Sequence, residues 1–146
     1  MKKILAVALG GEPVFTMFPF LESKFHVIYL TEEDHDLLYS NRIDEFISAL
    51  LKYGADYIFI DTCLEVWEGK LSCGQGFEIS KRILRKDPSQ KIVGITCHWD
   101  PIESEERFEG HGMVDVIHYV NYPNETDRKK EVEWVMSRIE KIEKRF

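Results

Sequence analysis

Five short apolar runs recur along this chain of 146 residues, and segments with helical periodicity separate them. The runs are Ile4 to Leu9, Phe25 to Leu30, Ala55 to Ile60, Ile92 to Cys97 and Val114 to Val120. Strands that are apolar along their whole length are typical of a parallel sheet that is covered by helices on both faces. The pattern therefore predicts five β/α units in one α/β domain over residues 1–146.

Helices are expected between and after these strands. Right-handed crossovers then make a flavodoxin-like three-layer sandwich the leading topology, with a five-stranded parallel sheet in the order 2-1-3-4-5. The clearest helical patterns are Asn41 to Tyr53, which Gly54 ends, and Glu125 to Lys144. Three further helices are expected: a distorted one around Pro13 and Pro19, one from about Gly76 to Asp87, and a short one from Asp100 to about Glu109.

Composition excludes several classes of function. The formal net charge of -7 disfavours a surface for nonspecific nucleic-acid binding. The apolar stretch after Met1 is too short for a signal peptide, and no window is long enough to cross a bilayer, so we expect no membrane contact. The three cysteines, Cys63, Cys73 and Cys97, lack metal-ligand spacing and favour a reducing cytoplasm.

Asp61 is the first candidate for chemistry, because it ends the apolar stretch Ala55 to Ile60. A residue at the end of a buried parallel strand lies at the carboxyl edge of the sheet, where open α/β folds bind ligands. Capping of a turn or of a helix is an alternative role for this aspartate. The edge is expected to gather Leu9 to Glu12, Thr31 to Asp34, Asp61 to Cys63, Thr96 to Asp100, and Asn121 with Tyr122.

At these positions the chain resembles the receiver domain of response regulators over about residues 2 to 144. The matching pieces are Lys3 to Val7 as the first strand, Tyr57 to Asp61 as the phosphoacceptor strand, Gly76 to Ile83 as the third helix, and Lys91 to Thr96 as the fourth strand. The resemblance implies that Asp61 accepts a phosphoryl group, that Thr96 contacts the phosphate, and that Tyr119 is the aromatic switch residue.

The sequence departs from the family's pattern where receivers hold cations. The positions of the acidic pair fall on Ala8 and Leu9, or on Gly10 and Gly11, which leaves Glu12 as the nearby carboxylate. No lysine occurs between Lys91 and Lys129. The loop from Thr62 to Gln75 is also longer than usual. We therefore expect an atypical receiver or pseudo-receiver with weak or absent phosphorylation of Asp61, weak Mg²⁺ binding at most, and no resident cofactor.

Such a module is expected to act through a protein partner, such as a histidine kinase or a downstream regulator, rather than as an enzyme. Either this partner or a homodimer would use the surface around Tyr119 and the final helix. We also expect Cys63 and Cys97, at the ends of neighbouring strands, to lie close enough to oxidise in purified protein.

The alternative from a different class is a small enzyme or metal-binding protein. Asp61, Cys63, His98 and Asp100 could supply mixed ligands or an acid/base pair at the same edge, although their spacing matches no established metal motif. Asp100 also fits the N-cap of a short helix. A phosphate site at Gly10 and Gly11 is a weaker alternative, because no complete phosphate-loop motif is present.

Overall fold

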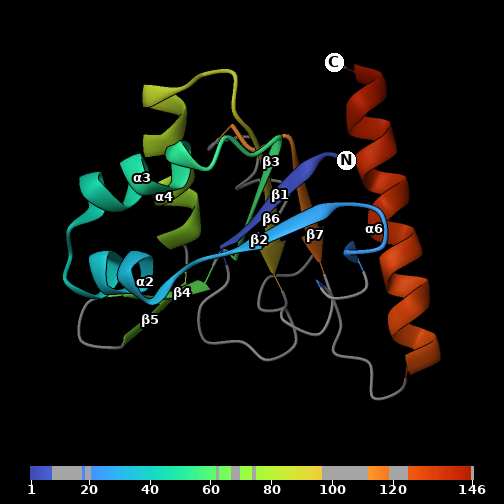
Figure 1. The fold of residues 1–146 in the computed structure, drawn as a ribbon, viewed down its shortest axis with the longest axis horizontal. Helices are drawn as coiled ribbons and strands as arrows, with labels where there is room; N and C mark the ends of the chain where they lie inside the picture. Colours follow the sequence, from blue (N-terminus) through green and yellow to red (C-terminus); the bar gives the residue numbers. More distant parts are fainter. Residues whose placement is uncertain are drawn as a thin grey trace.

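A parallel sheet of five strands forms the centre of the structure, a computed structural model that describes residues 1–7, 18, 21–61, 63–66, 70–73, 75–96, 112–118 and 125–145. The strands are β1 (Lys3–Val7), β2 (His26–Tyr29), β3 (Tyr57–Asp61), β6 (Lys91–Thr96) and β7 (Asp115–His118). They lie in the order β2-β1-β3-β6-β7, and every neighbouring pair is parallel. The predicted strand order is therefore confirmed (Figure 1).

Helices cover both faces of this sheet (Figure 1). One face is covered by α2 (Glu32–Tyr39), α3 (Ile43–Lys52) and α4 (Gln75–Lys86), and the opposite face by α6 (Glu125–Arg145). The helices predicted at Asn41 to Tyr53, from about Gly76, and at Glu125 to Lys144 correspond to α3, α4 and α6. The helix expected from Asp100 to about Glu109 lies outside the described residues. Of the distorted helix expected around Pro13 and Pro19, the structure describes Phe18 and Leu21, both in helical conformation.

The crossover from β2 to β3 contains two helices, whereas the sequence predicted one. Thr31, which we expected in an edge loop, is the N-cap of the unpredicted helix α2. After α2 the chain turns through Asn41, whose φ of 58° lies in the left-handed region, and then enters α3. Because α2 has only 8 residues and a weak apolar stripe, helical periodicity did not reveal it.

Two hydrophobic clusters, one on each face of the sheet, form the core. The cluster below α6 consists mainly of Ile4, Ala6, Phe18, Leu21, Tyr57, Phe59, Val93, Ile95, Val135, Ile139 and Ile142. The cluster below α2, α3 and α4 consists mainly of Leu5, Val7, Leu38, Phe46, Ile47, Leu50, Ile58, Ile60, Phe77, Ile79, Ile83, Ile92 and Met113. Successive residues of β1 and β3 alternate between the two clusters, as the period of a strand requires. The central strands therefore contribute side chains to the core beneath both layers of helices.

A small hairpin follows β3 in a region where the sequence predicted a loop. Its strands, β4 (Cys63–Val66) and β5 (Lys70–Cys73), pair antiparallel and form a separate two-stranded sheet. The prediction of a loop from Thr62 to Gln75 is therefore wrong across these strands. Strands of four residues are too short to show a clear alternation, and pairing between segments so near in the sequence needs little loop closure.

None of the helices in the described part of the chain has the length and apolar character that a membrane span requires.

Candidate functional site

The carboxyl ends of three central strands meet at one edge of the sheet. Asp61, the last residue of β3, is in register with Ile95 of β6. Thr96, the last residue of β6, follows directly and is in register with His118 of β7. On the other side of β3, Ile60 is in register with Val7, the last residue of β1. The expectation that Asp61 and Thr96 share the carboxyl edge is therefore confirmed.

Asp61 is a buried carboxylic acid. All five residues of β3 are buried, and Asp61 itself is only 5% exposed. A charged group in such a place is costly unless neighbouring groups compensate it. Asp61 is one of only three polar or charged residues that are buried in the described part of the chain, together with Asp34 and Ser80. Its burial also limits how easily a reagent from solution reaches the carboxylate.

Several predicted site residues lie outside the described part of the chain. These are Glu12, Tyr119, His98 and Asp100, and also Cys97. Thr96 is placed by its backbone in β6. Cys63 is placed by its backbone in β4, where its register partner is Cys73. The structure thus brings Asp61 and Thr96 to one edge, and it places Cys63 at the start of the hairpin that follows this edge.

The described residues at this edge do not form a complete metal site. Mg²⁺ requires octahedral coordination by oxygen atoms, usually from carboxylates, substrate phosphates and water. Here β1 ends at Val7, and the sequence continues with Ala8 and Leu9, neither of which supplies a carboxylate. Among the residues that the structure describes, no group of three or more His, Cys, Asp or Glu side chains could hold a metal ion. Asp61 is therefore not accompanied by a described set of ligands that fits Mg²⁺.

A second polar cluster, which the sequence did not reveal, joins α2 to the end of α3. The Asp34 carboxylate accepts a hydrogen bond from the backbone N–H of Thr31 at 3.2 Å and another from the hydroxyl of Tyr53. In return, the backbone N–H of Asp34 donates to the Thr31 hydroxyl at 3.2 Å. This reciprocal arrangement is a capping box, and its signature in the sequence is a threonine followed three residues later by an acidic residue.

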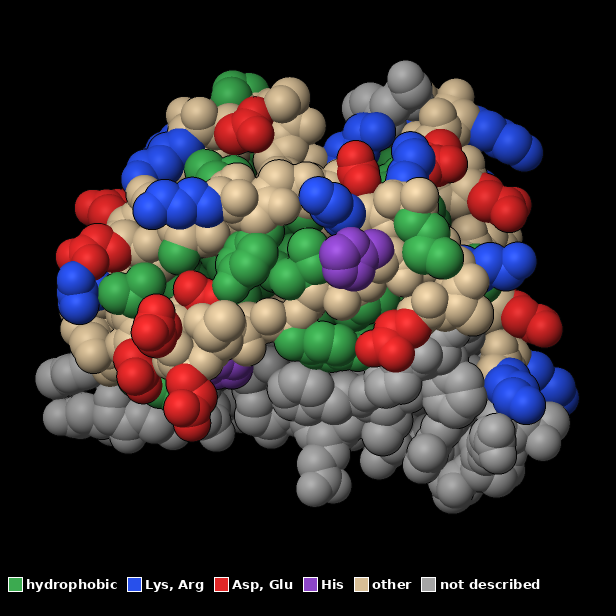
Figure 2. Space-filling model, in the orientation of Figure 1, with side chains coloured by type: hydrophobic (Ala, Val, Ile, Leu, Met, Phe, Trp, Pro, Cys, Tyr) green, Lys and Arg blue, Asp and Glu red, His purple; other side chains and the backbone are tan. Residues whose placement is uncertain are grey.

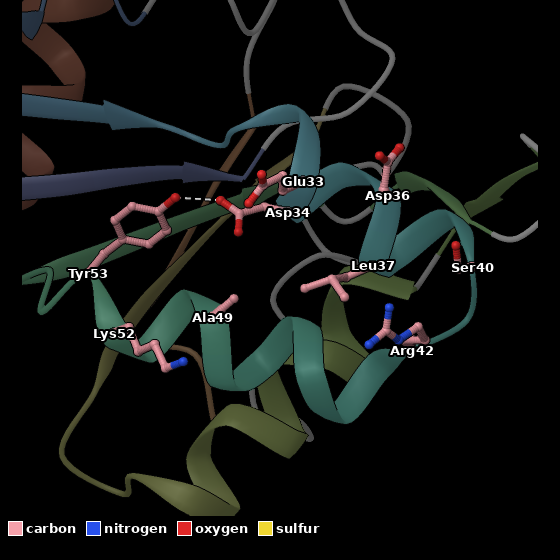
Figure 3. A pocket seen from close by; sticks show the side chains of 9 residues that line it. All are labelled: Glu33, Asp34, Asp36, Leu37, Ser40, Arg42, Ala49, Lys52 and Tyr53. Carbon is pink, nitrogen blue, oxygen red and sulfur yellow. Dashed lines mark hydrogen bonds between the residues drawn. The ribbon is translucent and has the colours of Figure 1, made fainter.

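This cluster borders an open cavity of about 530 Å³ between α2 and α3 (Figure 3). Acidic and basic side chains both line it, and its residues are Glu33, Asp34, Asp36, Leu37, Ser40, Arg42, Ala49, Lys52 and Tyr53. The hydrogen bond to Asp34, supported by burial, raises the pKa of Tyr53 above that of a free tyrosine. Burial lowers the pKa of His35, although the negative charge of Asp34 opposes that shift. Asp34 caps α2 and accepts the hydroxyl of Tyr53, so its contacts are explained by the stability of the fold and do not indicate a ligand site.

The sheet order, the two layers of helices and the acidic end of β3 together define the flavodoxin-like receiver fold. Several solved structures that resemble this chain are CheY-like receiver domains of response regulators. A response regulator from Thermotoga maritima matches with a TM-score of 0.63 at 19% sequence identity, covering 97% of each chain. A CheY-like receiver domain protein from Methanospirillum hungatei JF-1 matches with a TM-score of 0.63 at 15% identity, covering 100% of this chain and 99% of the other.

A third match is a receiver domain described as BeF₃-activated DrrB. Its TM-score is 0.60 at 17% identity, with 99% of this chain and 98% of the other covered. At such low identities these comparisons establish the fold. No known protein-family profile matches the sequence, and no curated protein sequence does.

Proposed function

We propose that this protein is a receiver-like signalling or regulatory module that acts by binding another protein, and that phosphorylation of Asp61 is weak or absent. The observation that carries the proposal is the position of Asp61. It ends the central strand β3 and lies in register with the residue before Thr96, at the carboxyl edge of a receiver fold. An acceptor carboxylate beside a hydroxyl residue supports an evolutionary origin of this protein in a receiver that was phosphorylated at this position.

Charge and access both weaken that chemistry. An acyl phosphate would bring about two negative charges to an edge where Asp61 is already buried. The sequence supplies no lysine between Lys91 and Lys129, and no acidic pair directly after β1 that could bind a compensating Mg²⁺. A hydrogen bond from Thr96 contributes only about 1.5 to 3 kcal/mol, even to a charged acceptor. The cost of placing these charges at a buried position therefore exceeds the stabilisation that this hydrogen bond offers.

The surface formed by α6 and β7 is the proposed contact for a protein partner, such as a kinase or a downstream regulator. Trp134 of α6 is 40% exposed, which makes it one of the most exposed large hydrophobic residues in the described part of the chain. The guanidinium carbon of Arg138 lies 5.3 Å from the centre of the Trp134 ring, and Arg138 Nε donates to Asp115 Oδ2 of β7 at 2.7 Å. Trp and Arg side chains held in place in this way are favoured at protein interfaces.

The phosphorylation half of the proposal is tested with a small phosphodonor. Purified protein is incubated with acetyl phosphate and Mg²⁺, and its intact mass is measured. We expect little or no modification. Asp61→Asn removes the candidate acceptor, and Asp44→Asn, on an exposed side chain of α3, is the matched control. Stoichiometric, Mg²⁺-dependent modification that Asp61→Asn abolishes and Asp44→Asn preserves would restore an ordinary phosphorylated receiver.

The docking half is tested with Trp134. Proteins captured by the wild type from a lysate of the source cells are compared with those captured by Trp134→Glu. We expect a specific partner to be lost with this variant and retained with Lys81→Glu on α4, which covers the other face of the sheet. Equal capture by all three proteins would exclude Trp134 from the contact.

A further inference from the structure

A different open cavity, of about 490 Å³, lies between the start of β7 and the C-terminal half of α6. The described residues that line it are Asp115 of β7 and four cations of α6, which are Arg138, Lys141, Lys144 and Arg145. The chain as a whole has a net charge of -7, so this cavity departs from the overall charge. A cavity with charges of mainly one sign attracts ligands of the opposite sign.

The excess of cations is not a property of α6 as a whole. The helix contains seven basic and six acidic residues, and Figure 2 shows side chains of both signs over the part of the molecule that α6 forms in Figure 1. Of the acidic side chains of α6 that the structure describes, none lines the cavity. The cations are therefore gathered on the side of α6 that lies against β7.

The stability of α6 does not explain this cluster. Lys144 and Arg145 belong to the last turn, where the dipole of a helix favours cations. Lys141 lies one turn earlier, and its neighbours at i−3, i+3 and i+4 are Arg138, Lys144 and Arg145. Like charges at such spacings repel one another on the surface of a helix. The cluster therefore weakens the helix unless an anion offsets the repulsion.

Two of the four cations are fixed against β7, and two are unpaired. Arg138 forms an ion pair with the carboxylate of β7, and the guanidinium of Arg145 donates to the carbonyl oxygen of Val114 at 2.8 Å. Lys141 and Lys144 are exposed, and neither forms an ion pair within the part of the chain that the structure describes. Fixed guanidinium groups beside unpaired ammonium groups can bind several anionic groups at once.

An exposed aromatic ring extends the cluster along the helix. Trp134, Arg138, Lys141 and Arg145 are spaced at i, i+4, i+7 and i+11, which places them on one side of α6. We call these four residues the α6 row. Trp134 is 40% exposed, and its ring centre lies 5.3 Å from the guanidinium carbon of Arg138. The row is about 16 Å long, which is the length of about five residues of an extended segment.

We propose that the partner protein binds this surface through an acidic segment. The carboxylates of the segment contact the four cations, and an apolar side chain at one end packs against Trp134. Charge complementarity selects this chemistry, because the cavity has three more positive than negative charges among its described residues. This inference rests on the docking surface of the proposed function, and it adds the chemistry of the partner.

Other anionic ligands fit the surface less well. A small anion would use the cavity alone and would leave the aromatic end of the α6 row without a role. A nucleic acid would bring a long row of phosphates to a chain with a net charge of -7, and repulsion by the rest of the protein would oppose it. A short acidic segment brings its charges only to the α6 row and the cavity.

The first experiment measures binding of a labelled synthetic peptide by fluorescence anisotropy. The peptide has about ten residues, with one phenylalanine and otherwise glutamate and serine, and the control peptide has glutamine in place of every glutamate. At about 0.05 M salt we expect the acidic peptide to bind with a dissociation constant of about 1 mM or below, and the control peptide at least about tenfold more weakly. Raising the salt concentration to about 0.5 M should weaken the binding of the acidic peptide.

The second experiment changes the two unpaired lysines. Lys141→Glu and Lys144→Glu together should raise the dissociation constant at least about tenfold, because two attractions become repulsions. The two glutamine variants together should have a smaller effect. Lys24→Glu and Lys81→Glu together are the matched control, since both side chains are exposed elsewhere and the net charge changes equally. Circular dichroism checks that each variant folds.

The contact with Trp134 is tested from the side of the peptide. Replacing its phenylalanine by serine should raise the dissociation constant about threefold or more, because the packing against the indole ring is lost.

The acidic segment is refuted by any of three results. The first is equal binding of the acidic and the glutamine peptide. The second is a double glutamate variant that binds the acidic peptide as well as the matched control does. The third is an oligonucleotide with the same number of negative charges that binds more tightly than the acidic peptide.

The capture experiment with Trp134→Glu separates this inference from the proposed function. A partner that is lost with Trp134→Glu but retained with the double glutamate variant would keep the docking surface and refute an acidic partner. Expected behaviour of the peptides, together with capture that Trp134→Glu leaves unchanged, would support an acidic segment at the cavity while the proposed docking through Trp134 fails.

Discussion

Asp34 connects two helices through a single side chain. It is 8% exposed, completes the capping box of α2 and accepts the hydroxyl of Tyr53 beyond the end of α3. We expect Asp34→Ala to lower the free energy of unfolding by about 1 to 3 kcal/mol, because one helix cap and one charge-assisted hydrogen bond are lost. Urea unfolding measures this change. Asp36→Ala, on the same helix but exposed, should cost less than about 0.5 kcal/mol. Equal effects of the two changes would show that the cluster contributes nothing.

Two residues with positive φ should respond to substitution in opposite directions. Gly54, which follows α3, has a φ of 61°, and Asn41 between α2 and α3 has a φ of 58°. An added Cβ at Gly54 would have no atom within 4 Å, so the expected loss for Gly54→Ala, about 1 kcal/mol, comes from the backbone alone. Asn41→Gly relieves the same strain and should be neutral or slightly stabilising. Thermal unfolding compares the two, and a loss of stability in both variants would contradict this explanation.

Among individual residues, the sequence predicted features that depend on one residue, such as the end of a helix or a strand. It did not predict contacts between residues that are far apart in the sequence. Gly54 was predicted to end its helix because glycine accepts a positive φ, and it does so. The end of β3 at Asp61 was predicted because a carboxylate interrupts an apolar run. The bond from Tyr53 to Asp34 joins residues 19 positions apart, and no local pattern indicates it.

Among the helices and strands, the long elements were predicted from the sequence and the short ones were not. Long apolar patterns predicted α3, α4, α6 and the order of the parallel strands, because burial on one or both faces sets a clear period. The short helix α2 and the strands of the hairpin were not predicted, since elements of 4 to 8 residues show less than three turns or periods. The candidate site could be predicted only to the level of the strand ends. Which loop residues surround Asp61 depends on packing that a strand pattern does not specify.

The hairpin changes the expectation for the cysteines. Cys63 was expected to lie near Cys97, which is outside the described residues, whereas its register partner across the hairpin is Cys73. Cα atoms of directly opposite residues in an antiparallel pair are about 4.5 to 5.5 Å apart, which is within disulfide range. We therefore expect mild oxidation of purified protein to join Cys63 to Cys73. Peptide mapping without reduction identifies the bond, and Cys97→Ser, which should leave it intact, is the control. A bond from Cys63 to Cys97 would reinstate the earlier expectation.

For the whole molecule, tyrosines that are neutral in the folded state make stability fall at alkaline pH. Burial, aided by a hydrogen bond to Glu22, raises the pKa of Tyr29 to about 12, and burial also raises the pKa of Tyr57. Since a free tyrosine has a pKa of about 10, the contribution of Tyr29 is complete below pH 10 and is lost as the pH rises toward 12. Urea unfolding at several pH values from 8 upward should show this decline. Tyr29→Phe should lose less stability across the same range, and an identical decline would exclude Tyr29 as a source.

The two hydrophobic clusters share the central strands, so they should not unfold separately. Phe59 belongs to the cluster below α6, and Phe46 to the cluster below α3. We expect Phe59→Ala and Phe46→Ala each to lower the free energy of unfolding by about 3 to 5 kcal/mol. Each variant should still show one transition, with the same midpoint by fluorescence and by circular dichroism. A second transition in either variant would show that one layer of helices can melt alone.

Near the end of the last helix, Glu143 contacts Lys2, which precedes β1, and Tyr57 of β3. Its carboxylate lies 2.6 Å from Lys2 Nζ and accepts the hydroxyl of Tyr57 at 3.0 Å. Mechanical tension between the two ends of the chain would load this exposed contact first, and an exposed ion pair contributes only about 0 to 1 kcal/mol. Because α6 forms none of the backbone ladder of the sheet, its remaining resistance comes from the side chains that it buries, Val135, Ile139 and Ile142. A pull on the two ends of the chain, unlike heat or urea, would therefore act on the packing of α6 before it acts on the strands.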